Sequence, residues 1–360
     1  MTDTQVPARI GALWQQRMHS LREYAVVRDG NVFGSGFTNN ALFTSEFDLA
    51  RRHLDRLMAQ YRESSFGEIF TGHEIENEAG RCFCTTSEAD LPRIDFDIDR
   101  YRAALRSDLT LVRGIGKKTG QLLKERGYDT IEKLLHHPKF HRGAAPVMER
   151  LSNENSSGLV DLLGSRHPRS HPLALGAAGF HKPEDYVFID IETMGFFSRP
   201  IILFGIGTIE QDRLVIRQYL LRDIAEEEAA LVATMDHLSK ANPALVTYNG
   251  RSFDLPYIAD RLAYYGIPPQ FRIPDFDLLH FSRRRWKDRL PSLRLTALEK
   301  EIFGIARVDD IPGQMVPEFY ETYMSTGNCG PLVPIVEHNR QDLISLALLF
   351  CHLMGEWYGR

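Results

Sequence analysis

The spacing of hydrophobic positions changes along the 360-residue chain and divides it into regions. Apolar residues recur at helical spacing over 10–24 and again over 47–61. Residues 68–86 instead have the pattern of short strands, with a turn signal at 77–80. We therefore expect residues 1–104 to form an α+β region, although this pattern alone assigns it to no fold.

The next two segments differ in composition. Residues 105–151 keep a helical spacing of apolar positions. Residues 152–182 are rich in Ser, Gly, His and Pro, which predicts a linker. Residues 183–360 then show a complete α/β pattern, which predicts a third, larger domain.

The α/β pattern predicts a definite order of elements. An apolar strand at 186–193 is followed by strands at 201–209 and 213–220, then by a helix with acidic residues at its start. A further strand at 244–248 runs into another helix, and a long helix begins near residue 332. The predicted order is thus three strands, helix, strand, helices and a final helix.

Composition excludes several classes of protein. Apolar residues make up 43% and charged residues 25% of the chain, which is typical of a folded domain. There is no apolar run of about 20 residues to span a bilayer, and the first ten residues lack a signal core. Four cysteines in so long a chain do not form a disulfide framework. We therefore expect a cytoplasmic protein without membrane contact.

Charge is unevenly distributed. The net charge is −5, yet residues 101–182 contain 14 Lys and Arg against 7 Asp and Glu, so this block carries +7 and the rest −12. Such asymmetry suggests contact with a polyanion. Charge alone favours a solvated surface, so the choice depends on the motifs.

Two glycines and two lysines mark a tight turn inside the basic block. Gly114-Ile115-Gly116 is followed at once by Lys117-Lys118 and an amphipathic helix. Glycines let a backbone approach a partner closely, and the free N–H groups of a helix start attract phosphate. The segment resembles a helix–hairpin–helix motif, which implies contact with nucleic-acid backbone without sequence readout. An ordinary helical hairpin with a glycine turn is the alternative.

Carboxylates recur at three places in the last region. Asp190 and Glu192 lie two apart on an apolar strand and share one face. Burying two like charges is costly unless a cation offsets them, and Mg²⁺ and Mn²⁺ prefer oxygen ligands. Asp254 starts a helix after Asn249-Gly250 and by itself would serve as an N-cap.

The long final helix adds an acid and a candidate base. Asp342 lies four residues after His338, so the two share one helical face, as an ordinary surface pair would also do. Together the four carboxylates suit two divalent cations, one to lower the pKa of a water and one to stabilise the leaving oxygen. A neutral His338 would take the proton of the water. These components indicate phosphodiester hydrolysis.

The three motifs resemble those of the ribonuclease H-like DEDD exonuclease superfamily. They are Asp-x-Glu on the first strand, Asn-x-x-x-Phe-Asp after the fourth, and His-Asn-x-x-Asp in the final helix. Asp309-Asp310-Ile311-Pro312-Gly313 and the run from Asp277 to Trp286 resemble the YprB-like subgroup. The resemblance implies a mixed five-stranded sheet flanked by helices and metal ligands at Asp190, Glu192, Asp254 and Asp342. Members with a histidine usually have it five residues before the last Asp; here the interval is four.

Other residues near these motifs are candidates for substrate binding. Arg283 and Arg284 would grip phosphate and Trp286 would stack on a base, unless they form a solvated helix face with Trp286 packed beneath it. Phe253 would pack beneath the site or wedge against a terminal base. Asn249 would orient its turn and touch substrate.

The combined prediction is a nuclease that uses two divalent cations, Mg²⁺ or Mn²⁺. The resemblance implies a 3′–5′ exonuclease acting on single-stranded DNA or RNA. A structure-specific endonuclease on the same fold and a non-catalytic nucleic-acid-binding protein are the alternatives. The residue pattern does not separate DNA from RNA.

Overall fold

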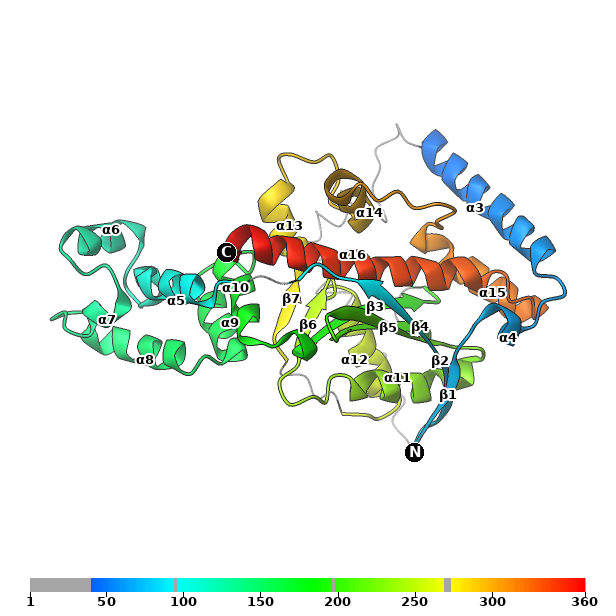
Figure 1. Cartoon of the computed structure of the whole chain (residues 1–360), viewed down its shortest axis with the longest axis horizontal. Coiled ribbons are helices and arrows are strands. Elements are labelled where there is room, and N and C mark those ends of the chain that lie inside the picture. Colours follow the sequence, from blue (N-terminus) through cyan, green and yellow to red (C-terminus); the bar gives the residue numbers. More distant parts are fainter. Residues whose placement is uncertain (1–39, 94–95, 196–197, 269–272, 360) are drawn as a thin grey trace, which may run out of the picture.

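The computed structural model describes residues 40–93, 96–195, 198–268 and 273–359, with side chains from Phe47 onward (Figure 1). The helix predicted at 10–24 lies outside these residues. The helix predicted at 47–61 is confirmed as part of α3 (Asn40–Gln60).

The described part of the chain forms one mixed sheet in the order β1-β2-β5-β4-β3-β6-β7. The strands are β1 His73–Asn77, β2 Gly80–Asp90, β3 Tyr186–Thr193, β4 Ile201–Glu210, β5 Arg213–Leu220, β6 Ala244–Thr247 and β7 Asp275–Asp277. Neighbouring strands in the run β1-β2-β5-β4-β3 pair antiparallel, whereas β3 with β6 and β6 with β7 pair parallel. The four strands predicted between residues 186 and 248 are confirmed to within one residue at each end.

The prediction of five strands was wrong, because the sheet has seven. The two additional strands on the β5 side come from the N-terminal region. β2 pairs antiparallel with β5 over eight residues, from Phe83 opposite Leu220 to Asp90 opposite Arg213. Sequence spacing showed β1 and β2 as a hairpin but contained no signal for this pairing, which joins residues more than 120 positions apart. The N-terminal region thus completes the sheet.

Helices cover both faces of this sheet (Figure 1). The helices that follow α3 are α4 Phe66–Ile69, α5 Ile98–Ser107, α6 Lys117–Glu125, α7 Ile131–Leu134, α8 His141–Ser152, α9 Ser156–Gly164, α10 Pro172–Gly176, α11 Glu227–Asp236, α12 Asp254–Tyr264, α13 Leu278–Trp286, α14 Leu295–Leu298, α15 Val316–Thr326 and α16 Leu332–Tyr358, of which α6, α7 and α8 project beyond the sheet. The long α16 lies across β3, β4 and β5, and α11 and α12 lie on the opposite face.

The alternation of side chains in β3 determines which face carries the acids. Tyr186 and Phe188 pack in the core that contains the second half of α16, whereas Val187, Ile189 and Ile191 pack in the core on the other face. Successive side chains of a strand point to opposite faces. Asp190 and Glu192 therefore belong to the face that α16 covers.

The structure also corrects the expectation of a linker at 152–182. This segment contains α9 and α10, and Leu159, Leu163 and Leu175 are fully buried in the same core as Phe188 and Phe350. Its Gly, Ser and Pro residues instead lie in short helices and at the helix ends. The helical segment α5–α10 is consequently packed against the sheet domain. Within the described residues no helix is both long and apolar enough to cross a membrane.

Candidate active site

The four predicted carboxylates come together beneath α16. Asp190 and Glu192 lie on β3, Asp254 is the first residue of α12, and Asp342 lies in α16. β3 and β6 are parallel neighbours, so their carboxyl ends meet at one edge, and α12 starts after β6. Glu192 and Asp254 are 8% and 6% exposed. A concentrated negative charge is therefore almost removed from water.

Burial and mutual repulsion dominate the electrostatics of this cluster. Burial, followed by the charges of Asp342, Glu192 and Asp254, raises the pKa of Asp190 well above its ordinary value. Burial, with Asp342 and Asp254, raises the pKa of Glu192 to about 8 although His338 opposes the shift. Burial also raises the pKa of Asp254 to about 7. The cluster holds protons at neutral pH unless other positive charge stabilises its ionised form.

Protein donors orient two of these acids. The Nδ2 group of Asn339, which is fully buried, donates to Oδ2 of Asp190 at 2.7 Å and to its carbonyl oxygen at 3.1 Å. A Cβ on Gly205 would come within 2.2 Å of Oδ1 of Asn339, so the glycine provides the space for this amide. The backbone N–H of Ile191 donates to Oδ1 of Asp254 at 3.2 Å. Asp254 therefore faces β3 and is not the helix N-cap, the position that Phe253 occupies.

Arg307 is a buried cation in contact with the cluster. Its side chain is 9% exposed and forms ion pairs with Glu299, Asp310 and Asp342. Its Nη1 atom also lies 3.3 Å from Nδ1 of His338. Glu299 is itself 1% exposed, so it anchors the guanidinium from the protein interior. Arg307 therefore fixes the position of Asp342 and offsets part of its charge.

His338 is held between two carboxylates. Its Nδ1 atom lies 2.6 Å from Oδ1 of Asp310, and its Nε2 atom lies 3.6 Å from Oδ2 of Asp342. Burial acts to lower the pKa of His338, but Asp342, the hydrogen bond with Asp310, and Glu192 outweigh it and raise the pKa to about 10. The imidazole is consequently protonated at neutral pH in this arrangement.

Sequence reasoning did not assign roles to Arg307, Glu299, Asp310 or Asn339. Asp310 lies in the run 309–313 that resembles the YprB-like subgroup, and Asn339 lies inside the final motif, so both had a signal. Arg307 and Glu299 had none, because Arg307 contacts Asp342 across 35 positions and Glu299 is connected to the cluster through Arg307.

The predicted substrate-binding residues differ in their burial and in the contacts that they make. Trp286 is 7% exposed and stacks against His352 at 5.9 Å, so its ring belongs to the core and offers little surface to a base. Phe253 is half-buried and packs against Tyr257. Asn249 has a φ of +64° and its N–H donates to Oδ1 of Asp277 at 2.8 Å, which fits the expected role in the turn. No described carboxylate lies within 4.0 Å of the Arg283 or Arg284 guanidinium.

The glycine turn protrudes from the helical segment and is open to solvent. Gly114, Gly116, Lys117 and Lys118 are all exposed. Gly114 has a φ of +88°, which explains the glycine. Gly116 has an ordinary φ of −94°, and a Cβ there would meet nothing within 4 Å. Neither conformation nor packing therefore requires glycine at position 116.

The donor set fits divalent cations in its chemistry, because it consists of buried carboxylate oxygens whose charge needs an offset. The placement of the side chains is less favourable. Within the described ranges no three His, Cys, Asp or Glu side chains are grouped so that they could hold one metal ion. Arg307 and Asn339 occupy oxygens of Asp342 and Asp190. Metal binding through Oδ1 of Asp342 would therefore require this oxygen to exchange its contact with Arg307, whereas Oδ2 accepts no hydrogen bond from Arg307.

Comparison with known proteins gives a likeness for this domain. Residues 187–354 match a family model described as RNase_H superfamily, so this part of the chain is RNase H-like. The chain is 33% identical over 228 residues to YprB of Bacillus subtilis (strain 168), a protein described as uncharacterized. This match covers 61% of the chain and 52% of YprB. The RNase H-like, YprB-like resemblance of the sequence is confirmed.

A second relative is more distant. DNA polymerase 1 of Aeropyrum pernix is 29% identical over 109 residues, which are 30% of this chain and 11% of that protein. The chain thus spans about half the length of YprB and about a tenth of the polymerase.

Proposed function

We propose that the chain is a nuclease that hydrolyses phosphodiester bonds and depends on divalent metal ions. The observation that carries this proposal is the convergence of Asp190, Glu192, Asp254 and Asp342 in a buried cluster of an RNase H-like domain. Burial of these acids close together raises the pKa values of Asp190, Glu192 and Asp254 and costs stability. A cluster of this kind serves no packing purpose, so we infer that it is retained for chemistry.

Two Mg²⁺ or Mn²⁺ ions are the proposed cofactors, with these four carboxylates as ligands. When bound, such ions lower the pKa of a water and stabilise negative charge on the leaving oxygen. The chain itself supplies the scaffold. Asn339 and the Ile191 N–H orient two of the acids, and Arg307 holds Asp342 against the buried Glu299.

His338 is the proposed general base, and Asp310 is its positioning partner. When Nδ1 carries the proton, its N–H donates to Oδ1 of Asp310. The unprotonated Nε2 then lies on the side of Asp342 and the cluster, where it can accept a proton. The charges of Asp342, Asp310 and Glu192 favour protonated His338. Positive charge bound among these acids would offset that effect and favour the neutral imidazole that a base requires.

The finer proposal is a 3′–5′ exonuclease on single-stranded DNA or RNA. It is supported by the resemblance of the three motifs to DEDD exonucleases and by the similarity to a DNA polymerase over 109 residues. The glycine turn at 114–118 is proposed to contact the phosphate backbone. Its support is the exposed Gly116, which no structural requirement explains.

Cleavage of end-labelled oligonucleotides by the full chain tests the proposal. Single- and double-stranded DNA and RNA, labelled at either end, would be incubated with Mg²⁺, Mn²⁺ or EDTA. We expect metal-dependent release of mononucleotides from the 3′ end of single strands. Asp190→Asn should abolish cleavage and retain binding. A wild-type protein that binds but never cleaves would instead support the non-catalytic alternative.

A further inference from the structure

The cations of the helical segment differ in whether they have counter-charges. Arg102 pairs with Glu154 at 2.6 Å, and Lys133 pairs with Asp129 at 2.8 Å. Lys117 and Arg169 have no carboxylate of the described residues within 4.0 Å, and both are exposed. The second group, with Arg284 of α13, therefore has charge available for a partner.

A stacked histidine pair lies among these available cations. The rings of His167 and His171 are 4.1 Å apart and 14° from parallel, and Nε2 of His167 lies 2.7 Å from Oδ2 of Asp108. Burial, followed by His167, Arg284 and Lys117, lowers the pKa of His171 to about 4 despite Asp108. Lys117 at the start of α6 and Arg284 in α13 are thus both close enough for their charges to act on one imidazole, and Arg169 lies two residues from it. We call Lys117, Arg169, Arg284 and the two histidines the seam surface.

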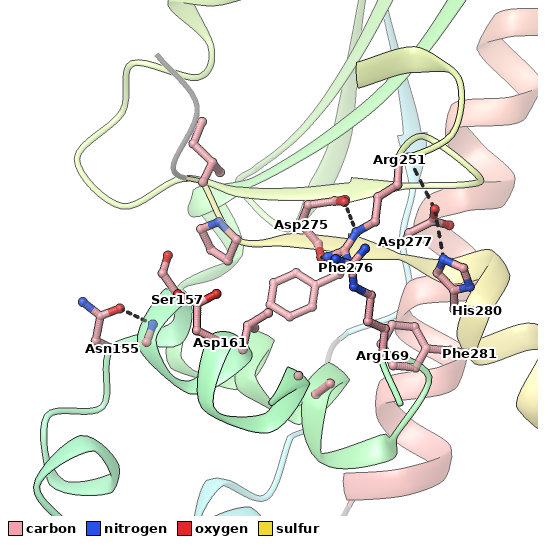
Figure 2. A pocket seen from close by; sticks show the side chains of 16 residues that line it. Asn155, Ser157, Asp161, Arg169, Arg251, Asp275, Phe276, Asp277, His280 and Phe281 are labelled. Carbon is pink, nitrogen blue, oxygen red and sulfur yellow. Dashed lines mark hydrogen bonds and ion pairs between the residues drawn. The ribbon is translucent and has the colours of Figure 1, made fainter. Parts of the chain in front are cut away.

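A cavity of about 950 Å³ is lined by Arg169 of this surface and by Arg251, which lies three residues before Asp254. It lies between α9–α10 and β7–α13, and Figure 2 shows Arg169 and Arg251 pointing into it from opposite walls. Arg251 already neutralises Asp275 at 2.5 Å, and Asp277 accepts the N–H groups of Asn249 and Arg251. One wall of the cavity is therefore the turn that leads directly to Asp254.

The seam surface is fixed relative to the carboxylates. The N–H of Asp97 donates to the carbonyl of Tyr358 at 2.8 Å, Arg100 donates to the carbonyl of Gly359 at 3.1 Å, and the Tyr101 ring packs on Tyr358. These contacts join α5 to the end of α16, whose other half carries Asp342. Tyr358 lies sixteen positions after Asp342, so this part of α16 extends about 24 Å at 1.5 Å per residue.

We propose that the seam surface binds the backbone of a single nucleic-acid strand and leads it from the glycine turn through the cavity to the carboxylate cluster. This inference rests on the proposed function and specifies the path of its substrate. Unpaired cations attract the phosphates, and the stacked rings of His167 and His171 border the path as a flat surface for bases. Strands too short to extend from the seam surface to the cluster would contact only one end of the path.

Strand binding by charge-reversal variants of the full chain tests this path. Fluorescence anisotropy would follow fluorescein-labelled oligodeoxythymidine of 4 to 24 nucleotides in EDTA, where no hydrolysis occurs. Arg169→Glu and Arg284→Glu should each weaken binding of the 20-nucleotide strand at least about tenfold at 50 mM salt and reduce the salt slope by about one. The matched control is Lys133→Glu, which makes the same charge change in the same segment at an already paired lysine.

Each outcome separates the path from the proposed chemistry. Equal losses in Lys133→Glu and the two test variants would overturn the seam surface, because net charge alone would then explain binding. Affinity that does not rise with strand length across this series would also overturn it. If Arg169→Glu and Arg284→Glu selectively weaken strand binding but the wild-type protein never cleaves, the path is supported and the proposed nuclease activity is rejected. Unchanged thermal unfolding in the variants excludes misfolding as the cause.

Discussion

At the scale of single residues, the candidate site is a balance between acids that repel and a few groups that hold them. Asp310 contacts His338 at 2.6 Å but lies outside the four proposed ligands, so its effect should pass through the imidazole. We expect His338→Ala to reduce kcat by about 10²-fold or more and Asp310→Asn by about 10–100-fold, with KM for the oligonucleotide little changed.

A double mutant distinguishes this partnership from general damage. If Asp310 acts by positioning His338, the His338→Ala, Asp310→Asn variant should be no slower than His338→Ala alone. Independent losses that multiply would contradict the assignment. The measurement is steady-state cleavage of a labelled strand, with Asp309→Asn as the control at the exposed neighbouring acid.

The raised pKa values also predict how stability depends on pH. Glu192 rises from 4.5 to about 8 and Asp254 from 3.8 to about 7, so the folded state binds more protons than the unfolded state between about pH 4 and 8. Stability must therefore fall as pH rises through this window, and the raised pKa of His338 extends the fall toward pH 10. Thermal unfolding in EDTA should show a lower Tm at pH 8.5 than at pH 6.

Two controls accompany that measurement. Glu192→Gln should flatten the decline, because the variant has no charge to bury at that position. Mn²⁺ should raise Tm more at pH 8.5 than at pH 6, since protons and cations compete for the same oxygens. A Tm that rises between pH 6 and 8.5 in EDTA would contradict the electrostatic account of the cluster.

At the scale of elements, the two glycines of the exposed turn make different predictions. Gly116 has an ordinary backbone and open space, so Gly116→Ala should leave Tm unchanged. If a phosphate approaches this backbone closely, the added methyl should weaken strand binding severalfold. Gly114→Ala forces φ of +88° on alanine and should lower stability by about 1 kcal/mol. Anisotropy and thermal unfolding measured on both variants separate contact from strain.

Element prediction succeeded where the signal was local. The strands from 186 to 247 and the helix from Leu332 follow from runs of apolar residues, and their motifs placed the acids on the correct elements. The prediction failed where the structure of a segment depends on packing partners that are distant in the sequence. The content of Gly and Pro in 152–182 is typical of a linker, yet Leu159 and Leu163 of this segment are fully buried in the core. The role of Arg307 could not be predicted from the sequence, because only the folded chain brings Arg307 into contact with Asp342.

At the scale of the whole molecule, the family match and the folding unit have different limits. The match begins at residue 187, but the sheet that carries the site begins at β1, because β2 covers the edge of β5. We expect a fragment of residues 183–360 to associate or precipitate, since its β5 would present unpaired backbone groups. A fragment of residues 40–360, which keeps β1, β2 and α3, should remain monodisperse in size-exclusion chromatography with light scattering. A monodisperse shorter fragment would contradict the structural role of β2.

The long helix α16 links the two ends of the proposed path. His338 and Asp342 lie toward its start, and Tyr358 at its end packs against α5 of the hairpin-bearing segment. Any displacement that strand binding causes at the segment is therefore transmitted along one rigid element to a proposed metal ligand. Thermodynamic linkage then makes the effect mutual. The factor by which Mn²⁺ tightens the binding of a long strand must equal the factor by which that strand tightens the binding of Mn²⁺.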